Sequence, residues 1–387
     1  MKVAITGGSG FLGSNLSNLI ASKGHQVKII DNFYRNSDQY INKNIEIFNC
    51  DIRNENSLIE YSKDADVLIH LAFINGTKYF YEKPELVLDV GVRGMLNSIN
   101  AIKKNKIKKF ILASSSEVYN EPINAPTSEN EMIKIPDINN PRFSYSSGKI
   151  ISESLTINSL NNIEVEKIIF RPHNIFGPKM GEEHVIPEIV KKIYMASNKF
   201  KDLKCSIEIQ GDGSETRAFC YVSDAINQIF FLIENGKNNN VYNVGISKEI
   251  SILNLINLIS DILKIKVKII NSKIKLGSAK RRCPDISKIK DLGYKLNDNF
   301  HDGLISTVLS YKEYYLKNNW MYKGKRILAI IPARGGSKGI KLKNLTKINN
   351  KSLIQITSET LKKIKYIDKI ILSSDHEEII KEGIKHG

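Results

Sequence analysis

Two residues with complementary acid–base chemistry stand four positions apart in the segment "YSSGK". Tyr145 and Lys149 face the same side if residues 144–158 form a helix, as the apolar spacing there predicts. A lysine ammonium beside a phenol favours the phenolate and lowers the tyrosine pKa, so Tyr145 is a candidate general base. The spacing alone is common among surface residues, so its meaning depends on what else the fold brings to this point.

A second polar group ends an apolar run in "LASSSEVYN", residues 112–120, where three serines precede Glu117. Serines at a strand end can form a plain turn, but a carboxylate directly after them needs a further reason. Glu117 can pair with an arginine, cap the turn or act as a base on a bound molecule. The sequence leaves these alternatives open at this point.

A glycine-rich loop, "TGGSGFLG", follows the first apolar run and opens a helical pattern. Gly7, Gly10 and Gly13 allow a tight turn and let backbone N–H groups approach a pyrophosphate at the helix N-terminus. Asp31 ends the next apolar run, where a carboxylate can bind ribose hydroxyls and repel a 2′-phosphate. This combination predicts NAD rather than NADP, although Arg35 lies close enough to blur the choice.

The elements that position these groups alternate between short apolar runs and longer amphipathic segments. Five runs predict buried parallel strands: 2–6, 25–31, 45–51, 66–73 and 108–115. Helical spacing appears in 11–24, 56–64, 85–105 and 144–158. This order predicts an α/β fold with a doubly wound parallel sheet, whose strand C-termini share one ligand-binding edge. Beyond "KIIFRPHNIFGP" the pattern loosens into a smaller α/β portion.

Composition narrows the class of protein. The 387 residues carry a net charge of +16, mainly from lysines spread along the chain, so a nucleic-acid-binding protein is the remote alternative. The four cysteines show no paired or metal-ligand spacing, and no apolar run suits a membrane span or a signal peptide. We therefore expect a reduced, cytoplasmic protein with no bound metal, no membrane contact and no nucleic-acid partner.

Nine motifs together resemble the extended short-chain dehydrogenase/reductase family, in particular its NAD-dependent sugar-nucleotide epimerases and dehydratases. They are "TGGSGFLG", "DNF", "CDIRN", "VLIHLAF", "SSSEVY", "YSSGK", "RPHNIFGP", "GDGSETRAFCYVSDA" and "RRCPD". The resemblance covers residues 1–320. It implies a Rossmann NAD-binding domain over 1–175, a mainly substrate-binding portion over 176–322 and a homodimer formed through the helices around 85–100 and 145–153.

The resemblance also implies roles for particular residues. Ser115, Tyr145 and Lys149 match the catalytic triad, and Tyr145 would take the proton of a sugar 4-hydroxyl while NAD⁺ accepts the C4 hydride. A nucleotide-diphosphate sugar would be held by Asn174, Arg217 and Arg282. The residues implied to bind NAD are Gly7, Gly10, Phe11, Leu12, Gly13, Asp31, Asn32, Asp51, Ile52, Leu71, Ala72, Tyr145 and Lys149. His173 and His184 are expected to be packing or substrate-rim residues.

The 4-keto intermediate is common to several reactions, and Glu117 favours one group of them. A 4,6-dehydratase needs a carboxylate to remove the C5 proton, and related dehydratases and decarboxylases carry glutamate here. The sequence therefore favours dehydration or decarboxylation, with UDP-sugar 4-epimerisation as the alternative. Ser116 stands where related dehydratases have Asp, which leaves the acid for the elimination open. Three other departures bear on the substrate, because Ala218, Gly91 and Asn120 stand where relatives have Asp, Asn and Gly.

A separate resemblance begins after a break near residue 323. The segment "AIIPARGGSKGIKLKNL", 329–345, resembles the start of the sialic-acid-type cytidylyltransferases, in which Arg334 and Lys338 would help to hold nucleotide phosphates. Residues 353–364, 369–375 and 376–387 fit a helix–strand–helix continuation. The later portions of such an enzyme are not in the sequence, so we expect a truncated fusion over 323–387 without transferase activity of its own, in a chain that serves surface-glycan synthesis.

Overall fold

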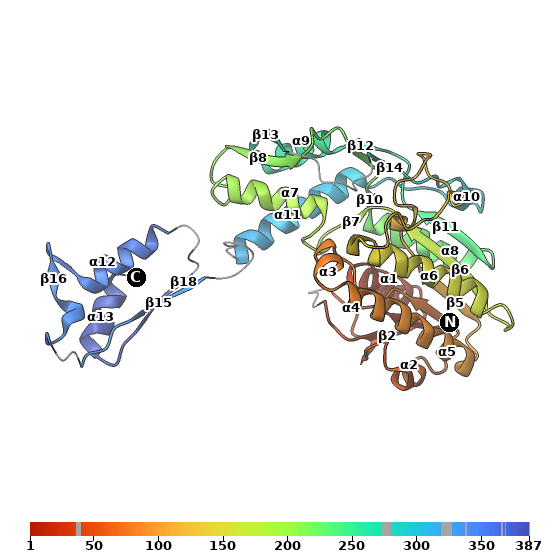
Figure 1. The fold of residues 1–387 in the computed structure, drawn as a ribbon, viewed down its shortest axis with the longest axis horizontal. Coiled ribbons are helices and arrows are strands. Elements are labelled where there is room, and N and C mark those ends of the chain that lie inside the picture. The colour runs from red at the N-terminus through yellow and green to blue at the C-terminus, as the bar shows by residue number, and fades with distance from the viewer. Residues whose placement is uncertain are drawn as a thin grey trace. The chain divides into compact units, whose positions relative to one another are not determined.

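The computed structural model describes residues 1–35, 40–272, 280–318, 327–336, 339–364, 367 and 369–386. The chain forms two compact units, Met1–Lys312 and Glu313–Gly387 (Figure 1). The predicted boundary near residue 323 falls outside the described residues. Among the described helices, none has the length and hydropathy needed to cross a bilayer.

A seven-stranded sheet forms the centre of the first unit, in the order β11-β6-β5-β4-β1-β2-β3. All neighbouring strands in it are parallel. The strands are β1 Lys2–Thr6, β2 Gln26–Asp31, β3 Glu46–Asn49, β4 Val67–His70, β5 Lys109–Ala113, β6 Glu166–Pro172 and β11 Asn240–Val244. The five predicted strands match β1 to β5, and the doubly wound fold is confirmed. Because β11 comes from residues beyond 175, the sheet draws on both predicted portions of the chain.

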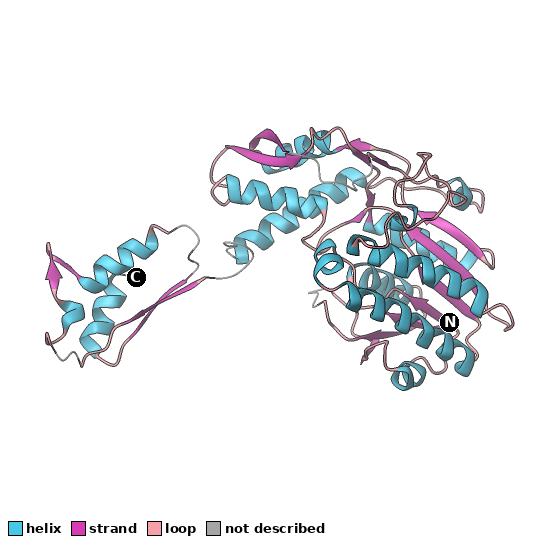
Figure 2. Cartoon of the chain, viewed as in Figure 1, coloured by secondary structure: helices cyan, strands magenta, loops and turns pink. Residues whose placement is uncertain are grey.

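Helices cover both faces of this sheet, as Figure 2 shows. They are α1 Phe11–Ser22, α2 Glu55–Tyr61, α3 Thr77–Glu82, α4 Pro84–Leu88, α5 Gly94–Asn105, α6 Ser144–Ser159 and α8 Val222–Asn235, with short turns η2 Ser116–Tyr119 and η3 Pro141–Phe143. Successive side chains of a strand point to opposite faces, so Val3 and Ile5 join one buried cluster and Ala4 the other. The sheet order reverses between β1 and β4, which is where such folds bind ligands.

The helix expected over residues 85–105 is interrupted. A π-helical turn, η1 Asp89–Arg93, separates α4 from α5. Such turns are rare and occur often at functional sites. Buried Gly91 lies inside this turn, beside α6.

The remainder of the first unit contains small sheets and the helices that accompany them. The elements are β7 Ile175–Phe176, α7 Val185–Ala196, β8 Lys204–Gln210, β9 Thr216–Arg217, β10 Cys220–Tyr221, β12 Ile250–Ser251, α9 Ile252–Leu263, β13 Lys266–Ser272, β14 Arg281–Arg282, α10 Ser287–Lys290 and the helix α11 Phe300–Asn318, whose residues from Glu313 on are assigned to the second unit. Strand β9 pairs with both β12 and β14, and this pairing places Arg217 beside Arg282.

The second unit contains the predicted helix–strand–helix continuation. Its elements are β15 Leu328–Pro332, η5 Lys343–Leu345, β16 Lys347–Ile348, β17 Lys351–Ser352, α12 Leu353–Lys362, β18 Lys369–Ser373 and α13 Glu377–His386. Strands β15 and β18 are parallel, and Ala333, Ile354 and Ile379 form a small core.

Candidate active site

The glycine loop turns tightly between β1 and α1. Gly7 has φ +70°, and a Cβ there would lie 2.7 Å from the backbone of Ala72. A Cβ on Gly13 would lie 2.3 Å from the carbonyl oxygen of Gly7. The loop therefore requires glycine at both positions, and α1 begins with Phe11 and Leu12 directly above it. The first-turn N–H groups of α1, which follow this loop at a helix N-terminus, fit a pyrophosphate.

Asp31 holds this loop at the end of β2. Its carboxylate accepts hydrogen bonds from the backbone N–H of Ser9 at 3.0 Å and of Phe33 at 2.9 Å. The strand order reverses between β1 and β4, and there the N–H of Leu71 donates to the carbonyl oxygen of Thr6 at 3.0 Å. The segment Leu71–Ala72 therefore closes the other side of the loop. These residues form one cradle, which fits the adenosine half of NAD.

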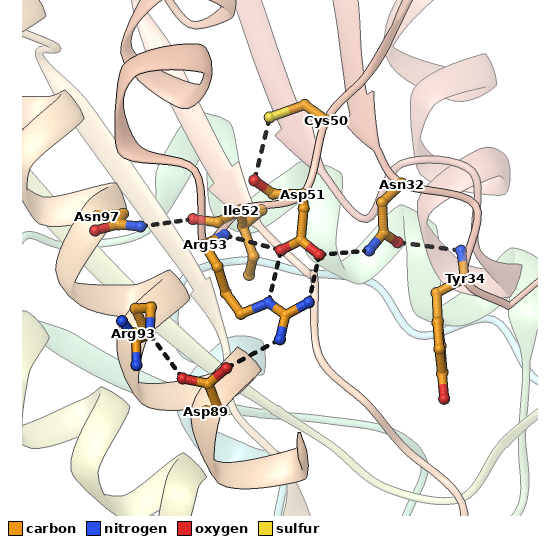
Figure 3. A network of polar contacts seen from close by, with 9 residues as sticks. All are labelled: Asn32, Tyr34, Cys50, Asp51, Ile52, Arg53, Asp89, Arg93 and Asn97. Atoms are coloured by element: carbon orange, nitrogen blue, oxygen red, sulfur yellow. Dashed lines mark hydrogen bonds and ion pairs between the residues drawn. The ribbon is translucent and has the colours of Figure 1, made fainter.

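Asn32 and Asp51 lie beside this cradle in a polar network (Figure 3). Asn32 donates to Asp51 at 3.1 Å, and Arg53 donates to the same carboxylate from Nε at 3.0 Å and from Nη2 at 2.7 Å. The hydrogen bonds from Arg53 hold the pKa of Asp51 at about 2. Arg53 also bridges to Asp89, the first residue of the π-helical turn. The side chain of Ile52 is buried, and its carbonyl accepts from a side chain on α5 at 2.9 Å.

Tyr145 lies between two phenylalanine rings at the carboxyl edge of the sheet. Phe80 stacks on it with centroids 5.1 Å apart, and Phe73 meets it edge-on, also at 5.1 Å. Burial raises the pKa of Tyr145, and a hydrogen bond with Ser115 offsets only part of this effect. The expected lowering by Lys149 is therefore wrong for this structure, because burial dominates and the ammonium lies elsewhere.

The ammonium of Lys149 is buried under β5. It donates to the carbonyl oxygen of Ala113 at 2.6 Å and lies 4.2 Å from the centroid of the Phe73 ring. Its distance to the centroid of the Tyr145 ring is 5.8 Å. Burial lowers the pKa of Lys149 to about 7. The structure thus brings Ser115, Tyr145 and Lys149 together, and the pKa of the lysine lies near neutral pH.

Glu117 forms an ion pair with Arg282, which arrives from β14. Arg282 also donates through Nη2 to Oε2 of Glu117 at 3.4 Å. Burial alone would raise the pKa of Glu117, but Arg282, together with Arg142 and Arg217, holds that pKa below its usual value. Glu117 is therefore ionised at neutral pH and surrounded by guanidinium groups. Among the roles that the sequence left open for Glu117, the structure shows the ion pair with an arginine.

The remaining predicted substrate residues lie on the same side. Asn174, between β6 and β7, has φ 42° and donates to the carbonyl oxygen of Ala218 at 3.3 Å. Burial lowers the pKa of Arg217 to about 10, and the neighbouring Arg282 contributes to the shift. His173 donates from Nε2 to Oδ1 of Asn243 at 3.0 Å. Arg217 and Arg282 gather at Glu117, and Asn174 is bonded to Ala218, the residue that follows Arg217.

A buried polar network behind the site was not predicted. Arg171, on β6, donates two hydrogen bonds of 2.9 and 2.6 Å to the carboxylate of Glu153 on α6. Ser114 donates to the same carboxylate, and Arg171 donates to Tyr119 at 2.9 Å. This network fixes the residues next to Ser115 and the helix that carries Tyr145 and Lys149. Its sequence signal is weak, because an arginine inside "FRP" and a glutamate inside "SES" look like surface residues.

In the second unit, the predicted phosphate loop follows β15. Gly335 donates its N–H to Asp375 at 2.6 Å, and Asn344 donates to the carbonyl oxygen of Arg334 at 3.0 Å. Lys338, the other predicted phosphate residue, lies outside the described residues. The loop thus has an ordered start, at the carboxyl end of a parallel strand.

Comparison with known proteins agrees with this geometry. Residues 3–245 match the family model of the NAD dependent epimerase/dehydratase family, and residues 328–384 match that of the cytidylyltransferases. The chain is 31% identical to UDP-N-acetyl-alpha-D-glucosaminuronate decarboxylase of Bacillus cytotoxicus, over 81% of this chain and 98% of the relative.

Two solved structures have the same fold over the first unit. UDP-N-acetylglucosamine 4-epimerase of Methanobrevibacter ruminantium, in complex with UDP-N-acetylmuramic acid, has a TM-score of 0.71 at 27% identity and covers 81% of this chain and 98% of its own. UDP-glucuronic acid 4-epimerase of Bacillus cereus, in complex with UDP-glucuronic acid and NAD, has a TM-score of 0.72 at 26% identity, covering 81% and 100%. With a glycine cradle for NAD beside a Tyr145–Lys149 pair, the chain belongs to the NAD-dependent epimerase/dehydratase family and is a sugar-nucleotide enzyme of that kind.

Proposed function

We propose that this enzyme oxidises C4 of a UDP-linked hexuronic acid and then releases the C6 carboxylate as carbon dioxide. The observation that carries this proposal is the group of three arginines, Arg142, Arg217 and Arg282, around an ionised Glu117. Guanidinium groups bind carboxylate and phosphate oxygens through paired hydrogen bonds. A sugar that carries both a diphosphate and a carboxylate matches this charge.

The chemistry divides among the residues at the carboxyl edge of the sheet. Bound NAD⁺ supplies the hydride acceptor for C4 and later returns the hydride. Tyr145 accepts the proton of the 4-hydroxyl in its phenolate form, with Ser115 hydrogen-bonded to it. The C6 carboxylate is then β to a ketone, so the C5–C6 bond breaks and its electron pair moves to O4 as an enolate. The protonated phenol of Tyr145 can donate a hydrogen bond to that oxygen. A proton from water then adds to C5 and restores the 4-ketone before the hydride returns to C4.

Decarboxylation suits Glu117 and Ser116 better than 4,6-dehydration does. Dehydration requires a base for the C5 proton and an acid for the departing C6 oxygen. Arg282 keeps Glu117 ionised, so Glu117 has no proton to give to the departing oxygen, and the Ser116 hydroxyl is no acid that could replace it. Loss of carbon dioxide removes no proton from C5, so Glu117 serves to hold Arg282 against the substrate. The relatives named as uronic-acid decarboxylases support this choice.

Product mass tests the proposal. The NAD-loaded protein is incubated with UDP-glucuronic acid and with UDP-N-acetylglucosaminuronic acid, while UDP-glucose and UDP-N-acetylglucosamine are the neutral controls. We expect loss of carbon dioxide from a uronic acid and no mass change in the neutral sugars. Loss of water, or no reaction with either uronic acid, would contradict the proposal.

The second candidate is 4-epimerisation of the same uronic acids. It is favoured by the likeness to a 4-epimerase solved with UDP-glucuronic acid and NAD. An epimerase turns the 4-keto sugar over and returns the hydride to its other face, so the product keeps the substrate's mass. In the same assay, an isobaric product with inverted C4 would assign this reaction.

Several further assignments stay proposals. From the family resemblance, we propose that the first unit divides at residue 175, that the site residues have the roles implied above, and that the protein is a homodimer. The four free thiols agree with a cytoplasmic location. Nucleic-acid binding stays the remote alternative and predicts salt-sensitive retention on DNA. Residues 323–387 are proposed to be a cytidylyltransferase-like part, and an assay with CTP and a nonulosonic acid tests whether it transfers a nucleotide.

A further inference from the structure

We infer that Phe73 is a positioning residue, whose ring face holds the ammonium of Lys149 and whose edge holds the ring of Tyr145. Phe73 follows β4, while the two residues that it contacts lie on α6. The Lys149 Nζ lies 4.2 Å from the Phe73 centroid, and the Tyr145 ring meets Phe73 at 5.1 Å with an interplanar angle of 81°. One side chain therefore contacts both members of the acid–base pair.

The Phe73 ring is seated in a slot made by two glycines. A Cβ on Gly91 would lie 2.2 Å from Cζ of Phe73, and a Cβ on Gly148 would lie 2.8 Å from the same atom. Both glycines are buried, and Gly91 lies in the π-helical turn η1. Any larger residue at position 91 would displace the ring. The absence of a side chain at Gly91 therefore leaves room for the Phe73 ring.

The face of an aromatic ring attracts a cation strongly when water is excluded. Lys149 is 2% exposed, and its ammonium donates a hydrogen bond to the Ala113 carbonyl. Two titratable groups act on the same buried region: Glu153, one turn further along α6, and His70 on β4. Removing the Phe73 ring face while keeping an apolar side chain takes away one attraction for the charged form of Lys149 and leaves these groups in place.

The test follows the titration of Lys149 directly, in the NAD-loaded protein. Acetic anhydride labels only the neutral amine, so the pH dependence of Lys149 acetylation, read by mass spectrometry, reports its titration. With Phe73→Leu, we expect the midpoint to move down by about one pH unit. We expect kcat to fall roughly tenfold with little change in KM, because the ammonium supports the chemical step rather than binding. An unchanged or raised midpoint would overturn the inference.

Gly91 gives an independent variant and Gly94 a matched control. Gly91→Ala should move the midpoint in the same direction, and should add little in the Phe73→Leu background, because both changes act through one ring. A Cβ on Gly94 would crowd Ile52 at 2.2 Å, so Gly94→Ala should lower Tm without moving the midpoint. Full additivity of Gly91→Ala with Phe73→Leu would contradict the inference. Labelling needs no sugar, so a failed uronic-acid assay leaves this test intact.

Discussion

The carboxylate of Glu117 pairs with the guanidinium of Arg282, although 165 residues separate them in the sequence. One residue follows β5 at the edge of the main sheet, and the other lies on β14 of a small sheet. The pair therefore joins the strand end that carries Ser115 to the part of the chain predicted to bind the substrate. This relationship gives Glu117 a role that depends on its charge.

Replacing Glu117 by Gln removes that charge and keeps the shape. We expect Arg282 to lose its orientation, so that KM for the uronic acid rises about tenfold while decarboxylation continues. A dehydratase with Glu117 as its C5 base would instead lose kcat by about 10²–10⁴. Steady-state kinetics separate the two results. Glu121 also acts on Arg282 electrostatically, so Glu121→Gln is the control and should have a smaller effect.

Asp31 should govern both cofactor affinity and cofactor choice. Asp31→Asn weakens the hydrogen bonds that hold the glycine loop and removes the charge that repels a 2′-phosphate. We expect the Kd for NAD⁺ to rise about tenfold and the preference over NADP⁺ to shrink, as measured by calorimetry. Asp66→Asn is the matched control, because Asp66 accepts from Lys2 at the opposite edge of the sheet. An equal loss in both variants would contradict a specific role.

The buried ion pair of Arg171 and Glu153 should stabilise the fold only while both charges are present. Glu153→Gln leaves the charge of Arg171 uncompensated, with side-chain exposures of 5% and 4% in the intact pair. We expect the free energy of unfolding to fall by about 3–5 kcal/mol in urea. Glu188→Gln breaks an exposed helix pair with Lys192 and should cost less than about 1 kcal/mol. Similar losses for both would refute the account of the network.

Lys149 should make stability depend on pH. Its pKa is about 7 in the folded chain, against the ordinary lysine value of 10.5, so the unfolded chain binds more protons between these values. Stability should therefore rise with pH from 7 towards 10.5, by about 1 kcal/mol per pH unit relative to Lys149→Met. Urea unfolding at pH 7, 8 and 9 measures the difference. Lys104→Met, on the exposed face of α5, should follow the wild-type curve; a parallel Lys149→Met curve would contradict the shift.

The sequence predicted the strands and the glycine loop well, because both depend on local pattern. Apolar runs and glycine spacing identify β1 to β5 and the cradle from neighbouring residues alone. The pairing of Glu117 with Arg282 depends on the long-range course of the chain, which no local pattern carries. The direction of the Tyr145 pKa was wrong for a related reason, because burial between Phe73 and Phe80 is a tertiary property.

The interrupted helix at η1 also escaped prediction. Apolar residues in 85–105 keep a helical spacing that an inserted residue in one turn hardly disturbs. In the sequence, Gly91 is a simple departure from the family pattern. In the structure, the nearby Phe73 ring explains why this position has no side chain. The roles of Arg171 and Glu153 were missed because charged residues are normally exposed.

The fate of the hydrogen at C4 tests the central claim most directly. A UDP-hexuronic acid carrying deuterium at C4 is incubated with the NAD-loaded enzyme, and the product is examined by NMR and mass spectrometry. If the hydride leaves C4 and returns to it within one binding event, the deuterium is found at C4 of the product, and turnover is slower than with hydrogen. Loss of that deuterium to solvent, or turnover that persists unchanged in Tyr145→Phe, would contradict the account.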